Sequence, residues 1–160
     1  MASVNRETHS LGLQEALVAA GPLAMAYERL WTSIWTQPYL SAQLLELCRL
    51  RVARLRGADA ELKVRHPSAQ QAGLSEDKVQ AVIGGQITAA RGFTPAERVA
   101  LDFAEMHAMD ASLISDELAD DVKTHFGEPG LVALIEALGV IDGRIRLGQI
   151  FSQMPSGSAS

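Results

Sequence analysis

The residues best suited to chemistry lie close together in the middle of the chain. Glu46 stands on a predicted helix, and Glu61, Arg65 and His66 follow within the next twenty residues. An acid four residues before a cation puts both side chains on one face if the segment is helical. The cation could then hold a substrate carboxylate while an acid moves a proton at carbon. We therefore treat Glu46, Glu61, Arg65 and His66 as candidate catalytic residues.

Each of these side chains also has a structural interpretation. Glu61 and Arg65 could form a surface ion pair, which contributes about 0.2–0.5 kcal/mol. His66 precedes Pro67 and could mark a helix break, and on a continuous helix it would point about 100° away from Arg65. Glu46 stands on the less apolar side of its helix. It would be solvated in a monomer, whereas in an oligomeric bundle it could face a pocket.

The chain has one cysteine, Cys48, so two-cysteine redox chemistry within one subunit is excluded. Cys48 falls at an apolar position of its predicted helix, which favours an inert, buried thiol. The sequence has no His and Cys cluster at metal-ligand spacing and no glycine-rich phosphate loop after a strand. We expect neither a metal nor a cofactor.

Composition limits the class of protein. At 160 residues the chain has the size of one domain, and 48% hydrophobic residues with only 5% aromatics favour a helical bundle. The net charge of −5 argues against nucleic acid. We expect a solvated, ion-paired helix face from the local basic cluster, which comprises Arg49, Arg51, Arg54 and Arg56.

Localisation is predicted from segments that the sequence lacks. No apolar run approaches the roughly 20 residues of a membrane span, and no secretory signal is visible at the N-terminus. The single cysteine suits a reducing compartment. We therefore expect a cytoplasmic protein without a membrane partner.

The elements that must position the candidate residues are helices, about seven in number, with no convincing strand. Apolar residues recur at spacings of three and four, and glycines and prolines separate the segments. The expected helices span residues 11–20, 22–35, 40–56, 59–73 with a kink or split at Pro67, 76–83, 94–109, 116–125 and 129–153. They form a single domain over residues 11–153, between a flexible N-terminus (1–10) and a flexible tail (154–160).

Several local signals are sharper than the general pattern. Thr94, Pro95 and Glu97 form a capping box at a helix start, and Gly127 should end a helix. Arg51 falls within an apolar stripe, so it should snorkel or meet an acidic partner. Asp142 and Arg146 stand one helical turn apart and could pair.

The stretch from Glu46 to Gly73, ELCRLRVARLRGADAELKVRHPSAQQAG, resembles the core of the carboxymuconolactone decarboxylase and alkylhydroperoxidase-D-like family. Residues 93–148 resemble that family's second half, so the likeness covers roughly residues 30–151. It implies an all-α, alkylhydroperoxidase-D-like bundle. It also implies a homo-oligomer, a trimer or a hexamer, with active sites near subunit contacts.

This sequence departs from the peroxidase members of that family, which have a glutamate, a Cys-x-x-Cys and a histidine four residues later. Aligned from Glu46 without gaps, those three later positions are Ala58, Glu61 and Arg65. A shift of one residue restores His66 at the histidine position and places Asp59 and Leu62 at the cysteine positions. Neither register supplies a thiol, and the sequence does not choose between them.

The resemblance therefore favours the decarboxylase branch, which also lacks the cysteine pair. It implies a cofactor-free enzyme that acts on a small organic acid or carbonyl compound by proton transfer or decarboxylation. In that interpretation Glu46 and Glu61 are acid–base candidates, Arg65 holds an anion and His66 assists. The alternatives are a non-catalytic oligomeric binding module with the same fold, and a thiol peroxidase that uses Cys48 alone, which the missing cysteine pair disfavours.

Overall fold

The computed structural model describes residue 13 and residues 16–153, and this part of the chain contains helices and no strand. The all-α prediction is confirmed. The termini predicted to be flexible (1–10 and 154–160) lie outside the described residues, as do residues 11, 12, 14 and 15 of the first predicted helix. The α-helices are α2 (Pro22–Thr36), α3 (Ala42–Leu55), α4 (Pro67–Gln71), α5 (Glu76–Ile83), α6 (Pro95–Met109) and α7 (Asp116–Gln153). Short 3-10 turns cover Glu61–Lys63, Ala89–Arg91 and Ala111–Leu113.

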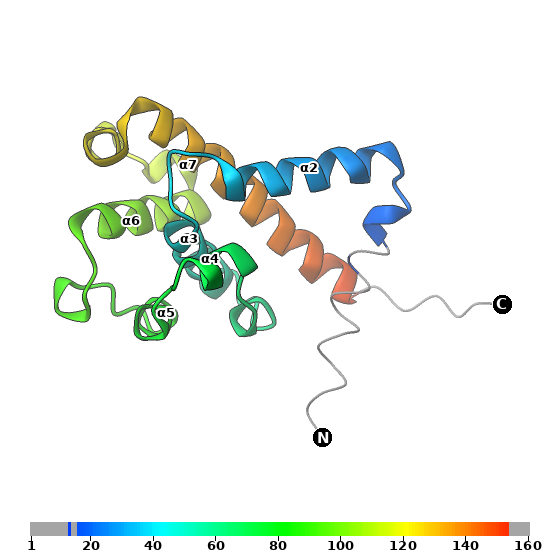
Figure 1. The fold of residues 1–160 in the computed structure, drawn as a ribbon, viewed down its shortest axis with the longest axis horizontal. Helices are drawn as coiled ribbons and strands as arrows, with labels where there is room; N and C mark the ends of the chain where they lie inside the picture. Colours follow the sequence, from blue (N-terminus) through cyan, green and yellow to red (C-terminus); the bar gives the residue numbers. More distant parts are fainter. Residues whose placement is uncertain (1–12, 14–15, 154–160) are drawn as a thin grey trace, which may run out of the picture.

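Helix α3 is the centre of the bundle. It packs against α4, α5, α6 and α7, while α2 contacts α7 and diverges from it toward the side of the molecule (Figure 1). Ser41 starts α3 by accepting a hydrogen bond from the backbone N–H of Leu44. Helix α3 carries buried, mostly apolar side chains on nearly all of its sides, as expected of a helix enclosed by others. Any polar group that α3 carries must therefore find a partner inside the protein.

Local capping signals place the helix starts where the sequence predicts them. The Thr94 side chain accepts from the Glu97 N–H at 3.1 Å, and the Glu97 carboxylate accepts from the Thr94 N–H at 2.8 Å. Ser75 caps α5 in the simpler manner, through the Lys78 N–H. Lys78 then pairs with Glu97 at 2.7 Å. These two caps and the ion pair hold α5 beside the start of α6.

Helix α7 contains one interruption, at Gly127. Its φ of 72° and ψ of 172° are accessible to glycine and strained for other residues, so two helices meet there across a kink. The predicted stop at Gly127 is confirmed. The predicted pair between Asp142 and Arg146 is present at 3.1 Å, and Arg51 has the predicted acidic partner, Glu105.

The helix predicted over residues 59–73 is wrong before Pro67, whereas the predicted split at Pro67 is confirmed because α4 begins there. The chain makes the short turn Glu61–Lys63, becomes extended at Val64 (φ −109°, ψ 157°), and starts α4 only after His66. Pro67 is one cause, because it disfavours the helical conformation for His66 and has no N–H to donate. Consequently Glu61 and Arg65 do not share a helical face, and His66 does not point away from Arg65 around a helix.

Candidate functional site

A buried ion pair on α3 forms the floor of the site. Glu46 and Arg49 stand three residues apart, and their side chains are 0% and 4% exposed. Arg49 Nε donates to Glu46 Oε2 and Nη2 donates to Oε1, both at 2.8 Å. This two-pronged geometry is the strongest that the two groups can make, and it offsets part of the cost of burying them. The expectation that Glu46 would be solvated in a single chain is wrong, because α3 is enclosed by other helices.

Arg49 also shapes the chain that follows α3. Its Nη1 donates to the Glu61 carboxylate at 2.9 Å, and its Nη2 donates to the Val64 carbonyl at 2.9 Å. The His66 N–H donates to Glu46 Oε1 at 3.2 Å. Burial by itself would lower the pKa of Arg49, but its hydrogen bond to Glu46 and the charges of Glu46 and Glu61 raise that pKa on balance. Arg49 is therefore a permanently charged centre that fixes residues 61–66 over α3.

The His66 ring is held in one orientation. It stacks on Trp35, with ring centroids 3.7 Å apart and planes 4° apart, and Trp31 meets its edge at 5.9 Å. His66 caps α4, because Nδ1 accepts a hydrogen bond from the Ser68 N–H at 3.3 Å. With Nδ1 accepting, the neutral ring carries its proton on Nε2. This tautomer is assigned from the hydrogen bond that the Ser68 N–H donates to Nδ1.

The environment of His66 favours the neutral ring. Burial lowers its pKa, and the positive charges of Arg49 and Arg144 lower it further, while Glu46 opposes them. The ordinary pKa of histidine is about 6.5, so a lowered value leaves the ring uncharged at neutral pH. His66 can thus donate a hydrogen bond from Nε2 without carrying charge.

Glu61 has one oxygen committed and one turned toward α7. Oε2 accepts from Arg49, whereas a methyl group placed on Gly148 of α7 would lie 3.8 Å from Oε1. The side chain is 32% exposed, so it can reach water. Of the two candidate acids, Glu61 is the one whose carboxylate is accessible. Glu46 is fully enclosed.

Arg65 folds back over its own loop. Its Nη1 donates to the carbonyls of Leu62 and Val64, both at 2.8 Å, and Nη2 lies 3.5 Å from Glu76. These donors are directed at the protein rather than at a ligand. In this structure Arg65 stabilises the loop that carries Glu61 and His66, which differs from the predicted role of an anion anchor.

A pocket of about 160 Å³ lies above these residues. Three of the four predicted site residues contribute to its wall, and Glu46 lies beneath it, connected through Arg49. The lining residues are Trp31, Arg49, Glu61, Val64, Arg65, His66, Pro67, Ile141, Arg144 and Ile145. The wall combines apolar side chains with a few polar groups, as small-molecule sites do.

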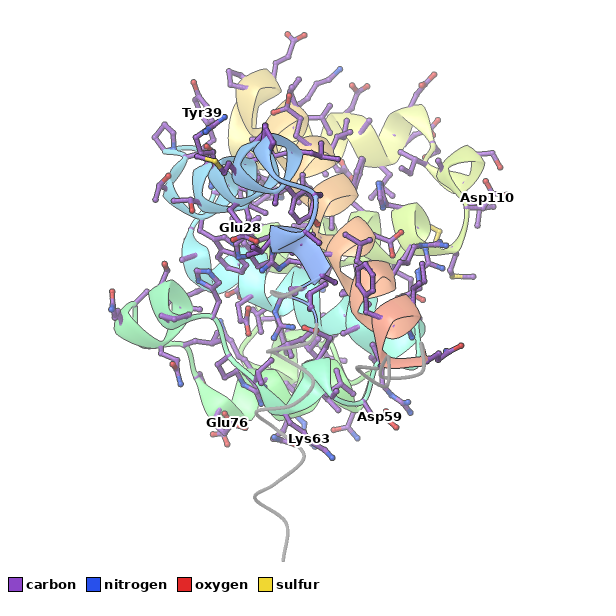
Figure 2. All side chains as sticks on the ribbon, turned by 90° about the vertical axis from the view of Figure 1, so that its right-hand side faces the viewer. Glu28, Tyr39, Asp59, Lys63, Glu76 and Asp110 are labelled. Atoms are coloured by element: carbon purple, nitrogen blue, oxygen red, sulfur yellow. The ribbon has the colours of Figure 1, made fainter. Side chains whose placement is uncertain are left out.

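Arg144 is the lining residue that sequence reasoning missed. Its guanidinium lies 4.4 Å from the Trp31 ring centroid and 5.7 Å from that of Tyr27, and Nη1 pairs with Glu28 at 3.0 Å. Glu28 lies on α2, on the side of the molecule that Figure 2 presents. One signal was available, since Arg144 stands between the apolar residues Ile141 and Ile145 of a core stripe. A charged side chain beside two buried residues must reach past the core to water or to a charged partner.

Cys48 takes no part in the pocket. It is 0% exposed, and burial raises the pKa of its thiol to about 12. Its Sγ faces the Ala100 carbonyl at 3.9 Å. The predicted inert thiol is confirmed, and a thiol with so high a pKa forms little of the nucleophilic thiolate. The geometry offers no support for a peroxidase that uses Cys48.

Across residue 13 and residues 16–153, no three or more His, Cys, Asp and Glu side chains gather in a way that could hold a metal ion. Within the same part of the chain, none of the helices has the length and apolar character needed to span a bilayer.

The chain matches a known protein family. The sequence profile of the carboxymuconolactone decarboxylase family matches residues 21–106, which is more than half of the chain. The matched range runs from α2 to most of α6 and includes Glu46, Glu61, Arg65 and His66, whereas Arg144 lies beyond it. No curated protein matches the chain.

Proposed function

Because the chain belongs to the carboxymuconolactone decarboxylase family, we propose that it is a cofactor-free enzyme that acts on a small organic acid or carbonyl compound by proton transfer or decarboxylation. One observation carries the proposal. A cation (Arg144), a neutral hydrogen-bond donor (His66) and an accessible carboxylate (Glu61) line one small pocket. Removal of a proton or of CO2 next to a carbonyl group needs these three kinds of group.

Arg144 is the anion anchor in this proposal. The donors of Arg49 are occupied by Glu46, Glu61 and Val64. Arg65 directs its Nη1 at its own loop and its Nη2 at Glu76. Arg144 has one ion pair, at its Nη1, and its guanidinium carbon lies over the Trp31 ring, 4.4 Å from the centroid. A guanidinium held in this way can present its remaining N–H groups to a carboxylate. The aromatic contact fixes its orientation.

His66 and Glu61 supply the proton chemistry. In a proton transfer, the Glu61 carboxylate removes a proton from the carbon beside a carbonyl, and the electron pair moves onto the carbonyl oxygen. The His66 Nε2–H donates a hydrogen bond to that oxygen as it becomes negative. Neutral histidine is suited to this role because it stabilises the oxygen without adding a formal charge. Glu61 then returns the proton to a carbon of the same intermediate.

Decarboxylation uses the same groups in another order. The bond to the carboxyl carbon breaks, CO2 leaves, and the electron pair enters the carbonyl-conjugated carbon. His66 again stabilises the oxygen of the resulting enolate. Glu61, which reaches water, relays a proton from a water molecule to that carbon, and the hydroxide left behind passes to solvent. Glu46 touches none of the reacting atoms and is a positioning residue, since it orients Arg49 and the His66 backbone.

A non-catalytic binding module is the second candidate. It is supported by the mutual neutralisation of Glu46 and Arg49, which leaves no unpaired charge on the floor of the site. Such a module would use Arg144 and the aromatic wall to hold an organic anion without turning it over. The two candidates differ only in the need for Glu61 as a proton carrier.

The test is a turnover screen with β-keto acids and carboxylated lactones, followed by CO2 release and by NMR of deuterium incorporation from solvent. We expect at least one compound to react and Glu61→Gln to lose at least about 100-fold in rate, as removal of a general base usually causes. Glu117→Gln, at an exposed position of α7, is the matched control. Ligand binding without turnover by the wild type would establish the module instead.

A further inference from the structure

Helix α2 presents three aromatic residues on one side. Tyr27, Trp31 and Trp35 follow one another at intervals of four, so their side chains share one side of the helix. This side is turned toward the pocket and the core, because Trp31 lines the pocket and Trp35 is only 6% exposed. The geometry of the pocket therefore depends on α2 as well as on the helices that carry the polar groups.

Trp31 contacts two of the groups that the proposed reaction uses. The Arg144 guanidinium carbon lies 4.4 Å from the Trp31 ring centroid. The centroid of the His66 ring lies 5.9 Å from the same point, with the two ring planes at 69°. Arg144 belongs to α7 and His66 precedes α4, and the two residues are 78 positions apart in the sequence. One indole ring is thus the common neighbour of the anion anchor and the hydrogen-bond donor.

Trp35 has a narrower set of contacts. Its ring stacks on the His66 ring, with centroids 3.7 Å apart and planes 4° apart, and it meets the Trp31 ring at 5.5 Å and 69°. Arg144 instead lies over the rings of Trp31 and Tyr27. The two tryptophans therefore differ, since Trp35 supports His66 and Trp31 supports both His66 and Arg144.

Both contacts of Trp31 have a preferred geometry. A guanidinium is attracted to the face of an indole ring, and two aromatic rings that meet at a steep angle place an edge against a face. The Trp31 ring is also set at a steep angle against the buried ring of Trp35. Rotation of Trp31 would break these contacts together, so this side chain sets the separation between Arg144 and His66.

We propose that Trp31 is a positioning residue that holds Arg144 and His66 at the separation needed to bind the carboxylate and the carbonyl group of one oxo acid at the same time. This role rests on the proposed function, in which the carboxylate binds Arg144 and the carbonyl oxygen binds His66. Trp35 positions His66 alone.

Substitution of one tryptophan at a time separates the two roles. Butyrate, which has a carboxylate and no ketone, is the probe for Arg144, and 15N NMR of the ring nitrogens is the readout for His66. We expect Trp31→Leu to weaken butyrate binding about 5- to 30-fold, which corresponds to a cation–π contact of about 1–2 kcal/mol, and to shift the His66 signals. Trp35→Leu should shift the His66 signals and leave butyrate affinity within about two-fold of the wild type.

Two further variants distinguish positioning from a merely structural role. Trp31→Phe keeps an aromatic face for Arg144, so its butyrate affinity should stay within about three-fold of the wild type. Loss of packing alone would affect Phe and Leu at this position alike. Leu30→Ala, at a 46% exposed position of the same helix, is the matched control and should change neither readout. Circular dichroism checks that every variant is folded, and His66→Gln assigns the His66 signals.

Arg144→Met, measured beside these variants, separates the two possible failures. If it weakens butyrate binding while Trp31→Leu changes only one readout, the role of Trp31 is rejected and the proposed function stands. Equal losses of butyrate affinity in Trp31→Phe and Trp31→Leu, or in Trp35→Leu and Trp31→Leu, reject the role in the same way. If Arg144→Met binds butyrate like the wild type, the anion anchor is rejected, and the role of Trp31 is rejected with it.

Discussion

Two arginine–carboxylate clusters border the same pocket and differ in their burial. Arg49 is 4% exposed and is bound by Glu46, by Glu61 and by backbone carbonyls. Arg144 is 16% exposed and has one carboxylate partner, Glu28, which is itself 45% exposed. The first cluster cannot release a partner without leaving a buried charge, whereas the second can exchange Glu28 for a ligand. The same pair of chemical groups therefore builds the floor of the site in one place and offers a binding group in the other.

The largest expected effect comes from breaking the buried cluster. Glu46→Ala leaves the Arg49 charge enclosed without its main partner, and we expect the free energy of unfolding to fall by about 3–5 kcal/mol. Urea denaturation measures it. The double variant Glu46→Leu with Arg49→Met removes both charges and should lose less than the single variant. A loss below about 1 kcal/mol for Glu46→Ala would show that the pair is not enclosed as described.

The next largest effect comes from removing the cation of the less buried cluster, Arg144 with Glu28. We expect Arg144→Met to weaken binding of small carboxylates by about 10- to 100-fold, because hydrogen bonds to charged groups contribute about 1.5–3 kcal/mol. The free energy of unfolding should change by about 1 kcal/mol, because the Glu28 partner is 45% exposed and the ion pair is partly solvated. Calorimetric titration with acetoacetate measures the affinity. Arg54→Met, on the exposed side of α3, is the control, and equal affinities for both variants would remove Arg144 from the site.

Removing Glu28, which competes with carboxylate ligands for Arg144, should have a smaller effect on affinity and of the opposite sign. Glu28→Gln frees the Arg144 guanidinium, so we expect carboxylates to bind a few-fold more tightly while the fold loses at most about 1 kcal/mol. The gain should vanish for uncharged esters of the same acids. If Glu28→Gln bound carboxylates more weakly, Glu28 would be a part of the anion site and not its competitor.

The smallest effect concerns pH. Burial lowers the pKa of His66, so the folded protein takes up this proton less readily than the unfolded chain. The stability contributed by the neutral ring is present above the unfolded pKa of about 6.5 and is lost as the pH falls through the lower, folded value. His66→Gln should therefore flatten the decline of stability below neutral pH. Burial also lowers the pKa of His107, so part of the decline should persist in the variant.

Local signals predicted most of the helices, because the groups that cap or break a helix are neighbours in sequence. The capping box at Thr94 and Glu97 fixes the start of α6, and Gly127 interrupts α7, in both cases through contacts within a few residues. The family resemblance was likewise read from the sequence, and the profile match over residues 21–106 confirms it. The roles of Glu46, Glu61, Arg65 and His66 stay predictions.

The segment between α3 and α4 could not be predicted in the same way. Residues 59–73 have helix-compatible composition, but Arg49 binds the Glu61 and Val64 carbonyls from outside the segment. In a helix, those carbonyls would instead accept hydrogen bonds from N–H groups four residues later. Because Arg49 belongs to α3, no pattern within residues 59–73 predicts its hydrogen bonds to these carbonyls. The same holds for Arg144, which reaches the pocket across 78 residues of sequence from His66.

The sequence by itself determined the helical class, the helix starts at Ser75 and Thr94, the single buried thiol and the family. These properties depend on composition and on contacts between near neighbours. Only the tertiary structure decided that Glu46 is enclosed, that Arg65 holds its own loop, and that Arg144 joins His66 and Glu61 at one pocket. The reason is physical, since burial and charge pairing depend on which helices pack together, and helices distant in sequence bring those groups into contact.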